Sequence, residues 1–192
     1  MQERLIKSCG VSMARASEPP AAPEAEDKND PEEPTDHALG RSRGGFSTKV
    51  HIVCDGQGHP LCFQLTPGQT HDSAVLDTLL EEANETLLDS QGEPIAWPLA
   101  LAGDKGYRAN WIDEYLLELN ILPVIPCKGS DHREERLIEF DRQLYRQRNI
   151  VERLIGWLKE SRRILSRFDK TAKNYAGFVT LAFIQRYLRL AE

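Results

Sequence analysis

Apolar and β-branched residues alternate with polar ones over residues 47–54 (STKVHIVC), a period of two that predicts a strand. Residues 55–58 (DGQG) have the composition of a tight turn, and residues 61–65 (LCFQL) supply the returning strand of a hairpin. Apolar residues then recur at helical spacing, which predicts a helix that Asp72 or Ser73 caps and that reaches about residue 84.

A short apolar run at residues 98–103 (PLALAG) is typical of a strand buried on both faces, and it ends at Asp104. The remaining pattern predicts a helix, a strand, a polar loop and two final helices, over about 111–119, 122–125, 127–139, 142–167 and 171–190. This order indicates an α/β domain in which a mixed sheet is covered by flanking helices. Asp104 then falls at the carboxyl end of a central strand, where the working groups of such sheets lie.

Residues 17–36 are rich in Pro, Glu, Asp and Ala and contain no large apolar residue, so they cannot offset the entropy of ordering. We therefore expect residues 1–39 to be a disordered or degenerate segment and residues 40–192 to form one folded domain. No apolar stretch is long enough to cross a membrane, and no secretory signal is present. The four cysteines form no CxxC pair, so a cytoplasmic location is the default expectation.

Charge is distributed unevenly along the chain, whose net value is −6. Acids outnumber bases nine to four in residues 1–40 and thirteen to six in residues 41–132, whereas residues 133–189 hold fourteen bases against seven acids. Such an asymmetry fits a basic surface that faces phosphates. A pair of helices with solvated arginines is the alternative, and charge alone favours it without deciding the matter.

One acid in residues 145–163 lies within a row of bases. At about 100° per residue, one helical face is shared by Arg148, Glu152, Gly156, Lys159 and Arg163. The apolar positions that we expect to face the core are Val151, Leu154, Leu158 and Leu165. The alternative is a solvated salt-bridge ladder of the Arg148–Glu152 type, which is common and needs no functional reason.

Asp104 favours a functional interpretation. Packing does not explain an aspartate at this position, because any turn residue could follow the end of an apolar strand. The alternative is that Asp104 is a cap or turn residue. Asp104 and Glu152 offer two carboxylates from different elements that can converge on one divalent cation. Hard oxygen ligands suit Mg²⁺ or Mn²⁺, and these ions assist phosphoryl transfer. Neighbouring arginines and lysines would then hold the DNA backbone.

Four segments resemble DDE insertion-sequence transposases: residues 40–61, 65–73 (LTPGQTHDS), 101–107 (LAGDKGY) and 145–175. The last contains the spacing of the Tyr-Arg-Glu-Lys signature of that group, Tyr145-x2-Arg148-x3-Glu152-x6-Lys159. The resemblance covers about residues 40–190 in the correct order. It implies a ribonuclease H-like fold and strand cleavage and transfer on double-stranded DNA, both transposon ends and target, with Mg²⁺ or Mn²⁺ as the cofactor.

The resemblance also implies roles for single residues. Asp104 would be the second metal-binding carboxylate and Glu152 the third, both catalytic, while Arg148 and Lys159 would contact DNA near the cleaved bond. Further candidate DNA contacts are Tyr145, Arg162, Arg163, Arg41 and Arg43. For the last two, a solvated lead-in to the strand is the alternative. No membrane partner is expected, and a homo-oligomer stays open.

The first aspartate of the family, on its first strand, has no counterpart in this chain. Residues 10–17 (GVSMARAS) give the best local match and put Gly10 at that position. We therefore expect a first strand that is degenerate or missing, and a truncated and impaired transposase. Asp30 and Asp36 would replace the ligand only with a shifted chain path, and Asp55 is a poor replacement because it lies in the hairpin turn.

Two other candidate sites weigh less. A zinc-like spacing is formed by His51, Cys54, His59 and Cys62, but the first two are an odd interval apart and point to opposite faces of a strand. His71 precedes a helix start and is expected to be a cap-region residue rather than a catalytic base.

Three hypotheses follow from the sequence. The first is a metal-dependent transposase domain that cuts and joins DNA strands by in-line attack of water or a 3′-hydroxyl. The second is an inactive remnant that binds DNA through its basic C-terminal helices, because a site without one of three ligands holds metal weakly. The third is an α/β interaction protein without a nucleic-acid role, which a flat salt titration would favour.

Overall fold

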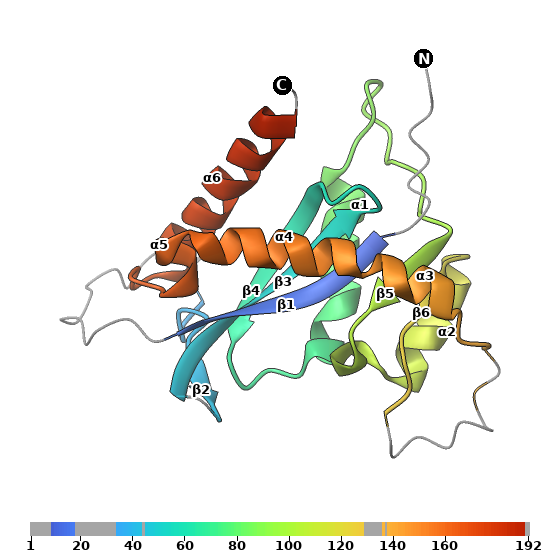
Figure 1. Cartoon of the computed structure of the whole chain (residues 1–192), viewed down its shortest axis with the longest axis horizontal. Coiled ribbons are helices and arrows are strands. Elements are labelled where there is room, and N and C mark those ends of the chain that lie inside the picture. The colour runs from blue at the N-terminus through green and yellow to red at the C-terminus, as the bar shows by residue number, and fades with distance from the viewer. Residues whose placement is uncertain (1–8, 18–33, 44, 129–135, 137, 191–192) are drawn as a thin grey trace. The chain divides into compact units, whose positions relative to one another are not determined.

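The computed structural model describes residues 9–17, 34–43, 45–128, 136 and 138–190 (Figure 1). Its strands are β1 Cys9–Ser17, β2 Gly40–Ser42, β3 Gly45–Asp55, β4 Pro60–Pro67, β5 Ala100–Gly103 and β6 Leu122–Val124. Its 3-10 helices are η1 Asp72–Val75 and η2 Lys105–Tyr107, and its α-helices are α1 Leu76–Thr86, α2 Asn110–Glu118, α3 Arg142–Gln147, α4 Asn149–Glu160, α5 Arg162–Leu165 and α6 Ala172–Leu190. The expected α/β class is confirmed.

The strands form one mixed sheet in the order β2-β3-β1-β5-β6, and β4 pairs with β3. β1 and β6 both run parallel to β5, whereas β2 runs antiparallel to β3. In the backbone register Gly10 is level with Ala102, two residues before Asp104. The first strand, which we expected to be degenerate or missing, is therefore present. Its sequence predicts a strand only weakly, because Val11 and Met13 are its only large apolar residues.

The chain divides into two compact units, and strands β1, β3 and β4 and helix α4 each contribute to both. One unit comprises Met1–Ser12, Ile52–Phe63 and His71–Arg153. The other comprises Met13–His51, Gln64–Thr70 and Leu154–Glu192. Asp104 and Glu152 both belong to the first unit.

The core of the first unit forms around α1 and α2. In α1 the buried side chains recur at i, i+3, i+4 and i+7, namely Leu76, Leu79, Leu80 and Ala83. Each large apolar side chain buried in this way stabilises the fold by about 1.5–3 kcal/mol. The same core contains Cys62, where burial, with the charge of Glu82, raises the pKa of the thiol to about 12. Cys62 is thus a neutral core residue.

The opposite face of β5 is lined by small residues, and α3 covers it. Ala100 and Ala102 form a cluster there with Val124 of β6, against which Phe140, Leu144 and Tyr145 pack. Since alanine leaves room, the helix lies close to the strand that ends at Asp104. The chain continues from α3 into α4, which bears Glu152 in its first turn.

The core of the second unit contains a buried arginine. Arg167 donates hydrogen bonds to the hydroxyl of Thr48 and to backbone carbonyls of Ala38, Asp169 and Lys170, and its guanidinium lies 5.2 Å from the ring centroid of Tyr175. The exposed fraction of Arg167 is 1%. Its charge is therefore compensated by hydrogen bonds to oxygen atoms.

The helix expected over residues 142–167 is three helices in the structure. Arg148 separates α3 from α4, and Ser161, with extended backbone angles, separates α4 from α5. The break at Ser161 shifts the register, so Ile164 is buried and Leu165 is 43% exposed. The expectation that Leu165 faces the core was wrong. Val151, Leu154 and Leu158 are buried, as expected.

Other expectations meet the structure in part. The α1 helix begins after a 3-10 turn, and its N-cap position is Val75, so neither Asp72 nor Ser73 caps it. Strand β1 lies inside residues 1–39, while residues 18–33 of the segment expected to be disordered lie outside the described residues. Among the helices described, none combines the length and apolar character that crossing a bilayer requires.

Candidate active site

Asp104 lies exposed at the end of β5, where it begins the turn η2. Its Oδ1 accepts a hydrogen bond of 2.6 Å from the backbone N of Lys105, and its carbonyl accepts one of 3.0 Å from Tyr107. Tyr107 is fully buried and anchors the turn in the core. Asp104 is thus a cap residue, as the alternative interpretation held, and its carboxylate is also accessible to solvent.

Glu152 lies in the first turn of α4 and bonds to the preceding turn. Its Oε1 accepts a hydrogen bond of 2.5 Å from Nη1 of Arg148, and the two side chains are 43% and 17% exposed. The i, i+4 pair expected from the sequence is present. For a pair this exposed the contribution to folding is small, about 0.2–1 kcal/mol.

Arg148 connects the two acids electrostatically. Burial lowers the pKa of its guanidinium, but the phenol of Tyr145, the hydrogen bond and charge of Glu152 and the charge of Asp104 together raise the pKa above its ordinary value. Asp104 is therefore close enough to influence the same guanidinium to which Glu152 is bonded. Asp104 has the smallest of these effects, so only the contact of Arg148 with Glu152 is a direct one.

Tyr145 serves as the packing residue of this arrangement. It is half-buried against Ala102 and its neighbours on β5 and β6, and its ring centroid lies 5.2 Å from that of Phe140. The guanidinium carbon of Arg148 lies 5.2 Å from the Tyr145 ring. Asp141 caps α3 by accepting hydrogen bonds from the backbone of the first turn. These contacts hold α3 against the strand that carries Asp104.

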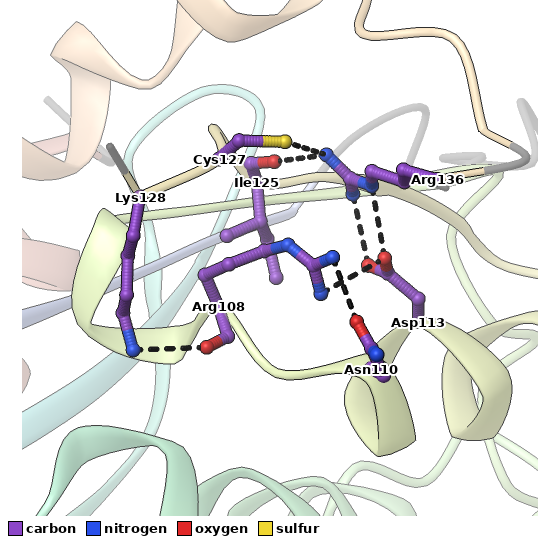
Figure 2. A network of polar contacts seen from close by, with 7 residues as sticks. All are labelled: Arg108, Asn110, Asp113, Ile125, Cys127, Lys128 and Arg136. Atoms are coloured by element: carbon purple, nitrogen blue, oxygen red, sulfur yellow. Dashed lines mark hydrogen bonds and ion pairs between the residues drawn. The ribbon is translucent and has the colours of Figure 1, made fainter. Parts of the chain in front are cut away.

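A buried ionic network follows Asp104 in the chain (Figure 2). Asp113 of α2 receives two hydrogen bonds of 2.9 Å from Arg136 and an ion pair of 3.2 Å from Arg108. Arg136 also donates a hydrogen bond of 2.6 Å to the carbonyl of Ile125, the residue that follows β6. Lys128 donates a hydrogen bond of 3.0 Å to the carbonyl of Arg108. The network ties the segment after Asp104 and the exit of β6 to α2.

Sequence reasoning missed this network, although one signal was present. Asp113 adjoins the fully buried Ile112 on the apolar side of α2, a position at which an acid needs a partner. Nothing in the sequence says that Arg108 and Arg136 are that partner, because Arg136 is 23 positions away.

The hairpin turn between β3 and β4 contacts the start of α4. Oδ1 of Asp55 accepts hydrogen bonds of 2.9 Å from the backbone N of Gln57 and of His59, and Oδ2 lies 2.7 Å from Nδ1 of His59. Gly58 has a positive φ of 85°, and a Cβ there would lie only 2.9 Å from Ile150. Asp55 therefore shapes a turn that abuts the helix bearing Glu152.

The remaining candidates for DNA contact belong to the other unit. They are exposed, and the structure does not place them against Asp104 or Glu152: Lys159, Arg162, Arg163, Arg41 and Arg43. The guanidinium of Arg163 lies 4.2 Å from the ring centroid of Phe178, so its position is held by stacking. Their roles stay predictions.

The side chains of the zinc-like spacing have other partners. His51 bonds to Thr66, His59 to Asp55, and the thiol of Cys62 donates to the carbonyl of Leu79. Within the part of the chain that the structure describes, no three His, Cys, Asp or Glu side chains gather as metal ligands would. His71 stands at the N-cap of η1 and makes no side-chain cap bond there.

The replacements considered for the first aspartate have other partners or lie outside the described residues. Asp36 accepts a backbone hydrogen bond from Ala38 in the other unit, and Asp30 is not described. Asp55 is engaged in its turn, as expected.

The sequence matches a known family over most of its length. The model of the transposase DDE domain matches residues 22–185. The chain belongs to this family. Its mixed α/β architecture is that expected from the resemblance, and a DDE transposase domain of the insertion-sequence type is confirmed.

Two relatives carry the same assignment. The chain is 31% identical over 148 residues to the transposase assigned to insertion sequence element IS402 of Burkholderia cepacia, a match that covers 77% of this chain and 63% of that protein. It is 31% identical over 144 residues to the transposase assigned to element IS6501 of Brucella ovis, covering 75% of this chain and all of that protein. The domain thus spans less than two thirds of the first relative.

Solved transposase complexes are distant in structure. The Mos1 transposase paired-end complex with the left transposon end has 15% identity and a TM-score of 0.39, over 79% of this chain and 54% of that one. The Mos1 mariner paired-end complex with Mn has 15% identity and a TM-score of 0.41, over 81% and 55%. The family assignment therefore rests on the sequence matches.

Proposed function

We propose that this transposase domain cuts and joins DNA strands by metal-assisted phosphoryl transfer, with Asp104 and Glu152 holding the same divalent cation. The observation that carries the proposal is Arg148, which is bonded to Glu152 and raised in pKa in part by Asp104. Two exposed carboxylates of one unit, both of which influence one guanidinium, carry more negative charge than it compensates, and this excess would attract a divalent cation.

The donor set fits Mg²⁺ or Mn²⁺. Carboxylate oxygens are their preferred ligands, and Mg²⁺ is commonly held by one or two carboxylates, with water and substrate phosphate in its other positions. Above Gly156, one turn after Glu152, a Cβ would meet nothing within 4 Å, so the surface there is open. When bound, the cation would lower the pKa of the attacking water and neutralise charge on the phosphate.

The residues of the chain have separate tasks in this proposal. Asp104 and Glu152 supply the carboxylates, and Arg148 would exchange its bond to Glu152 for a DNA phosphate. Exposed cations on α4, on α5, on β2 and just after β2 would bind the backbone of double-stranded DNA, both transposon ends and target: Lys159, Arg162, Arg163, Arg41 and Arg43. Tyr145 would act through packing and would contact DNA only with its exposed part.

The activity should be weak because Gly10 stands where the family carries its first aspartate. β1 adjoins β5 with Gly10 level with Ala102, so position 10 is close in the sheet to Asp104. A carboxylate at position 10 would supply the third ligand. Restoring it by Gly10→Asp is therefore an informative test.

The experiment is nicking of supercoiled plasmid DNA by the full chain in Mg²⁺ or Mn²⁺. We expect slow metal-dependent nicking that Asp104→Asn or Glu152→Gln lowers at least about a hundredfold, which corresponds to about 2.7 kcal/mol of activation free energy. Gly10→Asp should raise the rate. Glu118→Gln, an exposed acid at the end of α2, is the matched control and should leave nicking unchanged.

A second function, DNA binding without cleavage, is favoured by Gly10 itself. If neither the unaltered chain nor Gly10→Asp nicks DNA at any concentration of either metal, the catalytic proposal fails. A salt-dependent gel shift in the same samples would then support the binding function. Absence of binding even at low ionic strength would exclude both.

A further inference from the structure

Gly106, in the turn that Asp104 begins, has an unusual neighbour. A Cβ at Gly106 would lie 2.2 Å from Oδ2 and 3.0 Å from Cγ of Asp72. Real Cβ atoms do not approach other atoms so closely, so a side chain at position 106 would force the Asp72 carboxylate to move. Asp72 comes from η1, more than thirty positions earlier in the chain.

The same carboxylate also affects the electrostatics of the turn. Tyr107 is fully buried, and burial, followed by the charges of Asp72 and Asp104, raises the pKa of its hydroxyl well above the ordinary value. Both acids therefore lie within electrostatic reach of one phenol.

Asp72 is not needed as a helix cap. The N-cap of α1 is Val75, and Asp72 lies three positions earlier, as the first residue of η1. The acid is half-buried, and the turn Lys105–Tyr107 lies against its carboxylate. The contact that the structure gives the Asp72 carboxylate is therefore with the turn that Asp104 begins.

We infer that Asp72 is a positioning residue for Asp104, because its carboxylate braces the turn Lys105–Tyr107 and so sets the direction in which Asp104 presents its side chain to a cation. This inference rests on the proposed function, in which Asp104 is a metal ligand. The brace consists of one acid and one glycine, and both fall in the segments that resemble the family, residues 65–73 and 101–107.

Asp72 acts through the turn and not as a third ligand. Within the described residues no three potential ligands gather, and Oδ2 of Asp72 is directed at the backbone of Gly106. Groups that orient a metal ligand without touching the metal typically change metal affinity by about ten- to a hundredfold when they are removed.

The test combines hydrogen–deuterium exchange of the amides at 105–108 with Mn²⁺ binding measured by electron paramagnetic resonance. In Asp72→Asn and in Gly106→Ala the exchange should accelerate several-fold, and Mn²⁺ affinity should fall about tenfold or more. Asp77→Asn, the same charge change at the next acid of this region, is the matched control and should alter neither quantity.

A double variant makes the test specific for the contact. Since the added methyl of Gly106→Ala overlaps the Asp72 carboxylate, Asp72→Ala should relieve the overlap. In the double variant, the amides at 105–108 should therefore exchange more slowly than expected if the accelerations of the two single variants were added. Additive effects would overturn the brace.

Two outcomes separate this inference from the proposed function. If the unaltered chain binds no Mn²⁺, the metal proposal fails, while the exchange data still decide whether Asp72 braces the turn. If Mn²⁺ binds but Asp72→Asn abolishes binding with unchanged exchange, Asp72 is a ligand and the positioning inference is wrong. Unchanged exchange with unchanged affinity would also overturn it.

Discussion

Arg148 is the residue on which the character of the site depends. Without metal, its guanidinium donates a hydrogen bond to Glu152, and the charge of Asp104 contributes to raising its pKa. A divalent cation would compete with it for the same two acids, and a DNA phosphate would then be a natural new partner. Metal binding and DNA binding should therefore be coupled through this side chain.

Removal of the Arg148 charge should strengthen metal binding. In Arg148→Gln we expect Mn²⁺ affinity to rise roughly tenfold, equivalent to about 1.4 kcal/mol, because a cation no longer competes for Asp104 and Glu152. DNA affinity should fall in the same variant. Titration of Mn²⁺ measures the first effect, and Arg148→Lys, which retains the charge, is the control. A loss of Mn²⁺ affinity in Arg148→Gln would mean that the arginine organises the site instead.

At the residue scale, the sequence identified acids whose position in the hydrophobic or charge pattern is itself unusual. Asp104 follows an apolar strand and Glu152 lies within a row of bases, so both could be singled out. The contacts of Asp72 and Asp113 could not be predicted, because their partners Gly106 and Arg136 are distant in the chain. Acids that act through tertiary contacts leave little trace in local spacing.

At the scale of elements, α2 is held by charge as well as by apolar packing. Asp113, 6% exposed, pairs with Arg108 and Arg136, which in turn bond to the segments around η2 and β6. A buried pair contributes little net stability over an apolar equivalent, but loss of one partner leaves uncompensated charge. The network therefore joins elements whose relative position determines where Asp104 lies.

Neutralisation of Asp113 should destabilise the domain. We expect Asp113→Asn to lower the free energy of unfolding by about 3 kcal/mol, since two buried arginines lose their anion. Urea denaturation followed by circular dichroism measures this, and the exposed neighbour Glu114→Gln should change stability by less than about 0.5 kcal/mol. Equal stabilities of the two variants would show that Arg108 and Arg136 are compensated without Asp113.

Most elements could be predicted from hydrophobic periodicity, and the exceptions have physical causes. The hairpin, α1, β5, α2, β6 and α6 were expected near their observed bounds. β1 was expected to be degenerate or missing because CGVSMARAS has few large apolar residues and no aspartate at position 10. The breaks at Arg148 and Ser161 were missed because neither residue is a helix breaker, so tertiary packing and not propensity ends those helices.

At the scale of the whole molecule, charge is divided in a way that suits a DNA-processing domain. The net charge is −6, yet bases outnumber acids two to one over residues 133–189. Lys159, Arg162 and Arg163 expose their side chains there, on α4 and α5. Association with DNA should therefore depend on this part of the chain and on ionic strength.

Salt titration of DNA binding tests that dependence. Each phosphate contact contributes about 0.9 to the slope of log K against log salt concentration, so Lys159→Ala and Arg162→Ala should each reduce the slope by about one. Lys170→Ala, an exposed base outside these two helices, is the control and should leave the slope unchanged. A slope that no substitution alters would place the DNA contact elsewhere.

The most direct measurement is Mn²⁺ titration of four proteins: the unaltered chain, Asp104→Asn, Glu152→Gln and the double variant. If the two carboxylates share one ion, each single change weakens binding of that ion by at least about tenfold, and the double change removes no further ion. If they serve unrelated surfaces, affinity stays unchanged in both single variants, or each single change removes a different ion and the double change removes two. That result would contradict the shared site.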